Sequence, residues 1–515
     1  EDGIRDVERS RGLGDVYKRQ GVRTALFNYL IAKKTGGKFI LRIEDTDSKR
    51  TVAGAEDHIK DSLKWLGLNI DEGPIKQSER RILYKKRIDE LLKKGLAYYA
   101  FDSSAELERA RKESNGEFKY NHETRKNMIN SFTVSEEEAR SRIERGGYVI
   151  RMVVPEKKTI LVNDEIRGSL SFNSREIEDK VIMKSDGMPT YHFANVIDDH
   201  DMKITSVVRG EEWLSSFPSH VTLYKHFGWS PPKFYHLPLI LKSTGQGKLS
   251  KRDAEEQGHP VFAVQWEESK GFKESGYTPE GILNYLALLG WKGKGDDEKY
   301  SLNELVKKFN SKDINKSGAR FDIKKAVWIN HLHLRDFSSK KILSLCDQAN
   351  VLLEKKYNAD VCEEIIDLVK ERLNTLFDVE KEVFVFVSQP KNYDKEVIEK
   401  ITRNTIYNVL NFCKLKKELI SEPAMLKESL MSFGSEKQIS FGNIMKTLRL
   451  CIVGSLSGPD LFKIMDIIGP EETLNRIESL INKASESLNL KPDLSEGLLN
   501  ELTDLVEWPD LIIGK

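Results

Sequence analysis

The stretch that decides the fold is GVRTALFNYLIAKKTGGKFILRIEDTD, residues 21–47. Apolar side chains recur at helical spacing over residues 22–34, and Gly36-Gly37 then ends the pattern, which predicts a helix. The apolar run Lys38–Ile43 lies between turn signals and is typical of a buried parallel strand. A helix and a buried strand joined by short turns are typical of an α/β fold.

The α/β pattern extends to both sides of a polar segment. Two helices are predicted after the first strand, one with Gly67 just past its end and one capped by Ser78. Residues 102–180 are polar and only weakly periodic, which indicates an inserted domain. The α/β pattern resumes near Val181.

Strands are predicted again beyond the insertion, and helices dominate the rest of the chain. The segments Val181–Lys184 and Thr190–Ile197 alternate around a Ser-Asp-Gly turn, which predicts a β-hairpin. Ile204–Arg209 has the pattern of another buried strand. From about residue 256 the spacing is helical, for example over Asp360–Phe377.

Charge and cysteine content exclude several classes of protein. The 515 residues carry 82 Lys+Arg against 81 Asp+Glu, a net charge of +1, so nucleic-acid binding must use local patches. No apolar run is long enough to span a membrane. All 4 cysteines lie beyond residue 345 without a C-x-x-C pair, which disfavours a disulfide scaffold and excludes an N-terminal cysteine zinc site.

Two motifs contain basic residues suited to phosphate and carboxylate groups. The loop Gly247–Asp253 (GKLSKRD) carries Lys248 and Lys251, whose charges can meet phosphate oxygens. A solvated basic loop is the alternative. Arg209 opens RGEEW directly after a predicted strand, where it can bind a carboxylate through two hydrogen bonds or form an ordinary surface ion pair.

Two further motifs offer carboxylates and a phenol. In RIEDTD, residues 42–47, Glu44 can hold an ammonium group or a ribose hydroxyl, whereas the acidic residues after it can cap a helix. In TYHFAN, residues 190–195, Tyr191 can present its hydroxyl to a substrate. His192 has two open interpretations, a hydrogen-bonded core histidine or a contact residue.

In this order and spacing, the motifs resemble those of the bacterial-type glutamyl-tRNA synthetases, a family of class I aminoacyl-tRNA synthetases. The resemblance runs from Gly21 to about Lys515. It rests on RTALFNYL, RIEDTD, GAEDHI, SDGMPTYHFANVIDD, RGEEW, FYHLPLIL, KLSKR, ESGYTPEGILNYLALLGW and SGARFDIKKAVWINHLHL. It implies an α/β fold: a class I synthetase Rossmann-like catalytic domain with an insertion domain, followed by all-α stem-contact and anticodon-binding domains.

The resemblance also implies domain boundaries. They are 21–101 for the first half of the catalytic domain, 102–180 for a tRNA acceptor-binding insertion, 181–255 for the second catalytic half, 256–335 for the helical stem-contact domain and 336–515 for the helical anticodon-binding domain.

The activity implied by the resemblance is ATP-dependent attachment of glutamate to tRNA-Glu through glutamyl-adenylate. Such catalysis rests on positioning and on stabilising charge at the α-phosphate. The implied residues are Lys248 and Lys251 for catalysis; Glu44, Tyr191 and Arg209 for glutamate; and Gly21, Glu212, Ile240 and Lys251 for ATP.

The resemblance implies further partners and exclusions. Arg372 and Arg449 are candidates for the anticodon, with helix-surface salt bridges as the alternative. Mg²⁺ is expected with ATP, and zinc is not, because Tyr98–Phe101 (YYAF) stands where some relatives hold zinc with cysteines. A monomer in the cytoplasm, with no membrane contact, is expected.

Three other functions stay open. One alternative is a ligase that charges tRNA-Gln as well as tRNA-Glu. A short paralogue that glutamylates a modified tRNA base is disfavoured by the helical residues after 336, because that paralogue lacks an anticodon domain. A non-catalytic or crippled tRNA-binding relative is disfavoured by the preserved KLSKR, RGEEW and RIEDTD motifs.

Residues 1–20, EDGIRDVERSRGLGDVYKRQ, break the resemblance. Half of them are charged, and their apolar residues follow neither a period of 2 nor of 3.6. Family members carry a first strand, a substrate-binding arginine and a His-Ile-Gly-His-like signature here, and Gly21 is the last position that can belong to it. We interpret residues 1–20 as a non-native segment that replaces these parts, with a genuine tail as the alternative. An open strand position is then expected beside Phe39–Ile43.

The first prediction concerns this segment. The chain as printed should bind tRNA yet form glutamyl-adenylate very poorly, because the signature loop is replaced. A chain in which residues 1–20 become a strand followed by Pro-Ser-Pro-Thr-Gly and a His-Ile-Gly turn should regain activity. Pyrophosphate exchange with tRNA present compares the two chains. Full activity of the printed chain, or genomic confirmation of residues 1–20, would contradict the interpretation.

Overall fold

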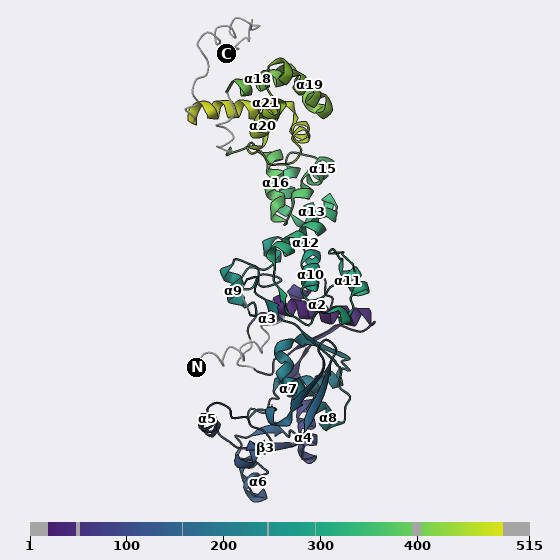
Figure 1. Cartoon of the computed structure of the whole chain (residues 1–515), viewed down its shortest axis with the longest axis vertical. Coiled ribbons are helices and arrows are strands. Elements are labelled where there is room, and N and C mark those ends of the chain that lie inside the picture. The colour runs from purple at the N-terminus through teal and green to yellow at the C-terminus, as the bar shows by residue number, and fades with distance from the viewer. Residues whose placement is uncertain are drawn as a thin grey trace. The chain divides into compact units, whose positions relative to one another are not determined.

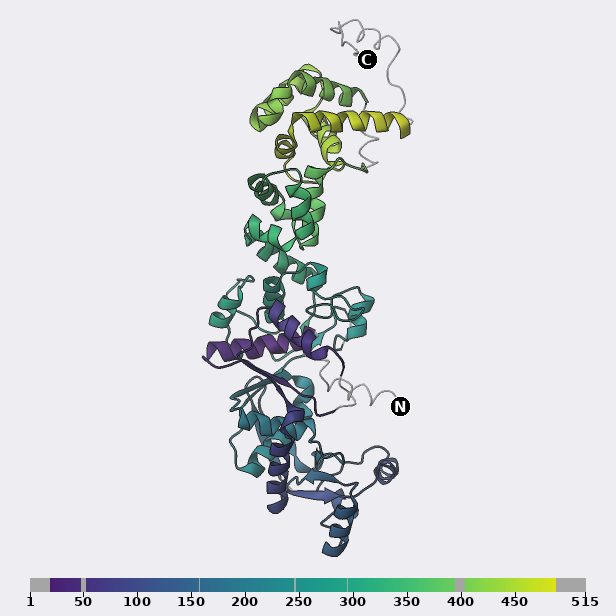
Figure 2. The ribbon, with the colours of Figure 1, turned by 180° about the vertical axis from the view of Figure 1, so that it is seen from behind.

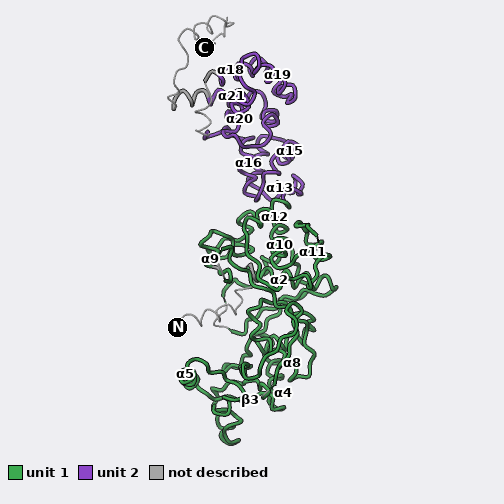
Figure 3. The backbone as a smooth tube through the Cα atoms, viewed as in Figure 1, with its two compact units in different colours: residues 1–333 green, residues 334–515 purple. Residues whose placement is uncertain are grey.

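The computed structural model describes residues 19–47, 52–156, 158–244, 247–293, 295–393 and 403–487. The chain divides into two compact units, residues 1–333 and 334–515 (Figure 3). The division lies near the predicted start of the anticodon-binding domain, and residues 1–18 of the segment interpreted as non-native lie outside the described residues.

The first unit alternates strands and helices before it becomes helical (Figures 1 and 2). The helices up to residue 336 are α2 (Arg19–Lys34), α3 (Ala55–Trp65), α4 (Arg81–Lys93), α5 (Ser104–Glu113), α6 (Glu136–Arg145), α7 (Tyr191–Asp201), α8 (Phe217–Phe227), α9 (Lys251–Glu256), α10 (Pro279–Leu288), α11 (Leu302–Lys308) and α12 (Ile323–Asp336). The strands are β1 (Ile40–Ile43), β2 (Glu72–Lys76), β3 (Ala97–Ala100), β4 (Val149–Met152), β5 (Thr159–Asp164), β6 (Gly168–Asn173), β7 (Val181–Met183), β8 (Ser206–Gly210), β9 (Lys233–Leu237), β10 (Ile240–Leu241) and β11 (Ala319–Arg320).

A four-stranded sheet in the order β6-β5-β9-β8 holds the strand that carries Arg209. β8 and β9 run parallel, with Arg209 opposite His236, and β5 is parallel to β9. β5 and β6 come from the segment predicted as an insertion, so that segment shares a sheet with the second catalytic half. The sheet register therefore brings the last residue of β5, Asp164, beside Phe234 near the start of β9.

The predicted parallel strand at residues 38–43 is present as β1. It pairs with β2 in a parallel sheet of two strands, and within the described residues it has no second strand partner. The opposite edge of β8 likewise has no strand partner in this part of the chain, although Asn28 of α2 donates a hydrogen bond to the Val208 carbonyl at 3.2 Å. The expected free strand position beside Phe39–Ile43 stays a prediction, because residues 1–18 lie outside the described residues.

The predicted second strand of the hairpin, Thr190–Ile197, is wrong, since Tyr191–Asp201 forms helix α7. The Ser-Asp-Gly turn is present, but only one bridge, Met183 to Pro189, follows it before the chain turns helical at extended Thr190. Buried polar residues misled the pattern, because Asn195 and Asp198 lie on the covered side of the helix and form hydrogen bonds there.

Ser78 also differs from its prediction as the cap of α4. It lies inside the 3₁₀ turn Gln77–Arg80 that precedes that helix. Its backbone N–H and hydroxyl donate to the Asp45 carboxylate at 2.8 and 2.6 Å. Asp45 therefore binds the start of a helical turn, as the capping interpretation of the acidic residues after Glu44 expects.

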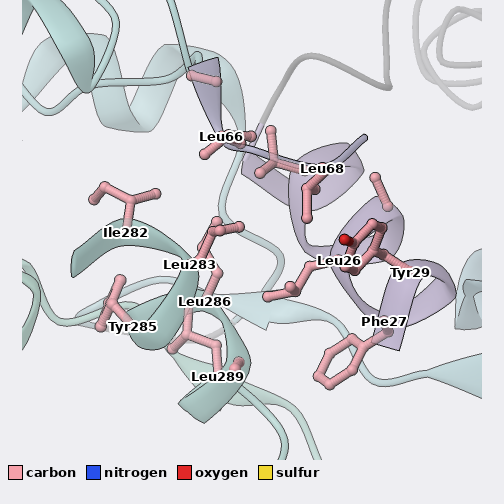
Figure 4. Close-up of a cluster of buried hydrophobic side chains, with 14 of the residues drawn as sticks. Leu26, Phe27, Tyr29, Leu66, Leu68, Ile282, Leu283, Tyr285, Leu286 and Leu289 are labelled. Carbon is pink, nitrogen blue, oxygen red and sulfur yellow. The ribbon is translucent and has the colours of Figure 1, made fainter. Parts of the chain in front are cut away.

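Apolar side chains of α2 and α10 form one core. Leu26 and Phe27 of α2 belong to the same buried cluster as Leu283 and Leu286 of α10 (Figure 4). The predicted helix after Thr278 is confirmed, because Thr278 accepts a hydrogen bond from Gly281 and Pro279 opens α10. The predicted catalytic and stem-contact segments are thus packed around shared apolar residues.

A buried arginine joins the same elements. Arg23 of α2 is fully buried, donates to the Leu289 carbonyl at 2.9 Å and also hydrogen bonds to the Pro238 carbonyl. Burial lowers the pKa of Arg23 to about 10, with Glu212 and Glu211 acting in the opposite direction. The guanidinium still carries its charge at neutral pH. It donates to one carbonyl just past the end of α10 and to one just past the end of β9.

The second unit is helical, and no strand occurs in its described residues. Its helices are α13 (Ser339–Leu345), α14 (Asp347–Glu354), α15 (Ala359–Val369), α16 (Phe377–Val387), α18 (Arg403–Leu415), α19 (Pro423–Glu436), α20 (Phe441–Val453) and α21 (Leu461–Ser487). The predicted helix Asp360–Phe377 is wrong beyond Val369, because a 3₁₀ turn over Lys370–Arg372 and extended Leu373 follow. The Asp378 carboxylate, inside α16, accepts from the Asn374 and Thr375 N–H groups of the connection.

None of the described helices is both long and apolar enough to cross a membrane.

Candidate active site

The glutamate-binding candidates come from three elements and meet at one place. Glu44 follows β1, Tyr191 opens α7, and Arg209 lies in β8. Tyr191 is close enough to Glu44 and Arg209 for their charges to influence its ionisation. The structure therefore brings together three residues that lie far apart in the sequence.

Glu44 sits beside a buried cation. Arg42 donates to the Asp199 carboxylate at 2.8 Å and to the Asn195 side-chain oxygen at 3.2 Å, and its Nη2 lies 3.4 Å from Glu44 Oε1. Burial raises the pKa of Glu44, and Arg42 opposes that rise. Asp199 takes the closest bond from Arg42, so the Glu44 carboxyl group keeps capacity to hydrogen bond to an ammonium group.

Tyr191 lies between aromatic and charged groups. Its ring centroid is 4.6 Å from that of Trp213 and 5.4 Å from that of His192. Burial and the nearby Glu44 charge raise the pKa of Tyr191, whereas Arg209 lowers it. The phenol is therefore neutral at physiological pH and can donate a hydrogen bond.

Arg209 is a buried cation with two imidazole partners. Its side chain donates from Nε to His236 Nε2 at 2.9 Å and from Nη1 to His220 Nδ1 at 3.1 Å. Only 8% of the residue is exposed, and its buried Nη2 has no hydrogen-bond partner in the part of the chain that the structure describes. Burial lowers the pKa of Arg209, and Tyr191 and Asp199 act in the opposite direction.

An unpaired donor on a buried cation is costly, since its hydration has been lost without replacement. The Nη2 of Arg209 therefore fits an anionic ligand. A substrate carboxylate is the group whose shape and charge match a guanidinium.

The loop with Lys248 and Lys251 is held at both ends. The Leu249 N–H donates to the Ile240 carbonyl at 2.9 Å, and Lys242 Nζ lies 2.7 Å from Asp253 Oδ1. Ser250 caps α9 and shares hydrogen bonds with Asp253. Lys251 is the first residue of α9, directly after that cap.

The predicted ATP-contact residues surround this loop. Lys248 Nζ lies 3.4 Å from Glu212 Oε1, and Ile240 is the buried first residue of β10. Gly21 lies near the start of α2, two residues before Arg23, which responds to the Glu212 charge. The loop, β10 and the start of α2 thus lie around Glu212.

Several residues near Arg209 were not predicted. His220 and His236 hydrogen bond to it, Asp164 accepts from His236 Nδ1 at 2.7 Å, and His192 Nδ1 lies 2.9 Å from His220 Nε2. His192 is therefore hydrogen-bonded, as one of its two interpretations expects. The FYHLPLIL motif contained His236, but nothing in local spacing connects it with Arg209.

In the second unit, Arg372 and Arg449 lie near one cavity of about 250 Å³. Arg372 lines it and pairs with Glu382 at 2.6 Å, and Arg449 donates to the Pro459 carbonyl at 3.0 Å. Arg372 lowers the pKa of Arg449, after the larger effect of burial. Both arginines have protein partners, so the salt-bridge alternative and the anticodon prediction both remain.

Comparisons with known proteins match both parts of the chain. Residues 21–328 match the family described as "tRNA synthetases class I (E and Q), catalytic domain", and residues 337–481 match "Anticodon binding domain". A glutamate–tRNA ligase from Azobacteroides pseudotrichonymphae is 44% identical over 474 residues, which cover 89% of this chain and 95% of the relative. One from Flavobacterium psychrophilum is 45% identical over 493 residues, covering 90% and 95%.

The chain belongs to the glutamate–tRNA ligase family of class I tRNA synthetases. The fold agrees, since the crystal structure of a glutamate tRNA ligase from Elizabethkingia meningosepticum, in complex with its amino acid, matches with a TM-score of 0.85 and 40% identity. That match covers 92% of this chain and 97% of the other. A glutamate-tRNA synthetase from Elizabethkingia anophelis matches with a TM-score of 0.83 and 40% identity over 90% and 97%.

The second prediction concerns the Lys248–Lys251 loop. Asp253→Asn should increase amide hydrogen exchange in residues 247–256, because the ion pair with Lys242 is lost and the cap is weakened. We expect at least about a tenfold increase, as for loss of one cap. Exchange measured by mass spectrometry should be unchanged by the control Asp57→Asn, whose carboxylate is 82% exposed. Equal exchange in Asp253→Asn and the unsubstituted chain would show that this contact does not hold the loop.

Proposed function

We propose that this protein attaches glutamate to tRNA-Glu at the expense of ATP, through a glutamyl-adenylate. The observation that carries the proposal for the site is the buried, partly unpaired guanidinium of Arg209, next to Tyr191 and Glu44. A cation, a neutral phenol and a carboxylate match the carboxylates and the ammonium group of one glutamate molecule.

In the proposed glutamate site, Arg209 binds a carboxylate of the substrate. Glu44 holds the ammonium group, and Tyr191 donates a hydrogen bond beside them. The site orients the reacting carboxylate toward the α-phosphate of ATP, so that the substrate oxygen attacks and pyrophosphate leaves. No protein nucleophile is needed, because positioning and charge stabilisation supply the acceleration.

The proposed ATP site lies between the lysine loop and the start of α2. Gly21, Glu212 and Ile240 contact the nucleotide, and Lys251, assisted by Lys248, stabilises negative charge that gathers at the α-phosphate. Support comes from the contacts that hold the loop beside Glu212. Lys248 must exchange its Glu212 contact for phosphate oxygens when ATP binds.

Mg²⁺ belongs to the proposal as a counterion of the ATP phosphates. Within the described residues no group of three or more His, Cys, Asp or Glu side chains is placed to hold a metal ion. We therefore assign Mg²⁺ no protein ligand and no step, and we propose that the protein uses no zinc.

The second unit is proposed to bind the anticodon through the cavity beside Arg372 and Arg449. The cavity is also lined by Lys381 and exposed Phe384, so it offers a cation and an aromatic ring to a base. We propose a monomer that acts on the tRNA pool of the cytoplasm. The relatives reported above are named as ligases and give no support to a non-catalytic tRNA-binding function.

A charging assay tests the proposed function. The chain whose residues 1–20 are replaced as in the first prediction should form glutamyl-tRNA from ATP, glutamate and tRNA-Glu, and glutamine should not replace glutamate. The chain as printed serves as the second sample. Absence of charging by both chains would exclude the proposal.

The third prediction concerns Lys251. Lys251→Ala should reduce the activation rate by about 100-fold with little change in ATP affinity, because the charge acts mainly in the transition state. Pyrophosphate exchange by the chain with the restored N-terminal segment measures the rate, and Lys270→Ala, at an exposed lysine outside the loop, is the matched control. A loss of less than about threefold in Lys251→Ala would show that the assigned role is wrong.

The fourth prediction concerns glutamate selection. Arg209→Gln should raise the glutamate KM by about 100-fold and leave tRNA binding nearly unchanged, since a charged hydrogen-bond donor to the substrate is lost. The control is Arg175→Gln, an exposed arginine paired with Glu123. If the KM of Arg209→Gln equals that of the control, Arg209 has a structural role only.

A further inference from the structure

We propose that two neutral histidines, His236 fixed by Asp164 and His220 backed by His192, are positioning residues that aim the Arg209 guanidinium at the substrate carboxylate while leaving its charge uncompensated. This inference rests on the proposed function, because it concerns how Arg209 binds glutamate.

The His236 side of the arrangement is rigid. Asp164, at the end of β5, accepts four hydrogen bonds: from the Ile166 and Arg167 backbone N–H groups at 3.0 and 2.8 Å, and from the backbone and ring of His236 at 3.0 and 2.7 Å. Asp164 and His236 are 3% and 0% exposed. The proton on His236 Nδ1 faces Asp164, so Nε2 has a lone pair and accepts from Arg209 Nε.

His220 also accepts a hydrogen bond from Arg209, but with Nδ1 in place of Nε2. His220, in α8, accepts from Arg209 Nη1 with Nδ1. Its proton must then lie on Nε2, from which it donates to His192 Nδ1 in α7. Burial and the Arg209 charge lower the pKa of His220 well below its usual range. The ring is therefore neutral at physiological pH.

Neutral hydrogen-bond acceptors can hold the Arg209 guanidinium in place without cancelling its charge. A carboxylate in direct contact with Arg209 would hold it equally well but would neutralise the charge that has to bind substrate. Imidazole rings instead occupy Nε and one side of Nη1, and they leave Nη2 unpaired. The only anion in this chain of contacts, Asp164, is separated from Arg209 by a whole ring. Two hydrogen bonds thus fix the orientation of the Arg209 guanidinium, while its positive charge remains available to the substrate carboxylate.

A matched pair at His220 tests the inference. His220→Asn places an amide oxygen near the position of Nδ1 and can still accept from Arg209, whereas His220→Leu cannot. Removing one hydrogen bond to a charged group should weaken glutamate binding by about 10- to 100-fold in His220→Leu, with His220→Asn within about threefold of the unsubstituted chain. ATP and tRNA binding should be unchanged in both variants. His226→Leu, on the same helix but bonded to the Val153 carbonyl, controls for packing loss.

A pH series provides a second readout. The charged and titratable groups that face His220 are Arg209 from β8, His192 and Tyr191 from α7, His236 from β9, and Lys180. Because the pKa of His220 is lowered, the neutral ring persists below the usual histidine range, and the glutamate Kd of the unsubstituted chain should stay constant from about pH 8 to about pH 6. His220→Asn should show the same flat profile.

The variants are made in the full-length chain whose residues 1–20 are replaced as in the first prediction, because that chain is the one expected to be active. The measurements are calorimetric titrations with glutamate, together with KM and kcat from pyrophosphate exchange. A rise in Kd and KM in His220→Leu, with kcat changed less than about threefold and rescue by His220→Asn, supports the inference. Equal Kd values for the two variants, or a similar rise in His226→Leu, would overturn it. If the chain with the restored N-terminal segment and an intact His220 binds no glutamate, the proposed function itself is overturned, which is a distinguishable result.

Discussion

The positive charge of Arg209 is buried under the edge of a sheet, and the surrounding structure is arranged to tolerate it. Burying an ion removes its hydration, which costs several kcal/mol unless other groups replace the water. Here the replacement comes from two imidazole rings and from the electrostatic influence of Tyr191 and Asp199. The sheet order β6-β5-β9-β8 is what puts the first of those rings, on β9, directly opposite the cation on β8.

The residues proposed to bind substrate could be chosen from the sequence because they stand in short motifs at the ends of strands. Glu44 and Arg209 follow or end apolar runs, where α/β sheets expose their functional side chains. Their supporting partners were not predictable. Asp164, His220 and His236 lie on three different elements, and only the sheet register and the packing of α8 bring them to one guanidinium. No periodicity within a single segment records that proximity.

Elements of the fold that depend on local sequence signals were also predicted better than those that depend on packing between distant residues. Helix α10 was predicted from Thr278 and Pro279, since capping is a local property of the backbone. Thr190–Ile197 was misread as a strand because burial there is not confined to apolar residues. Asn195 and Asp198 are buried in a polar network with Gln77, so hydrophobic alternation is a poor guide where the core itself is polar. Such exceptions concentrate beside the proposed substrate site.

The fully buried guanidinium of Arg23, between α2 and the end of α10, has a consequence for the evolution of this chain. Its contacts and the apolar core of Figure 4 join the catalytic and stem-contact segments, so these two segments are expected to evolve together. A recombination event between residues 255 and 279 would keep the Pro238 carbonyl but separate Arg23 from its partner Leu289 and separate Leu26 and Phe27 from the apolar side chains of α10. Insertions and exchanges are therefore tolerated in surface turns of this unit, whereas the join between its two segments is closed to module shuffling.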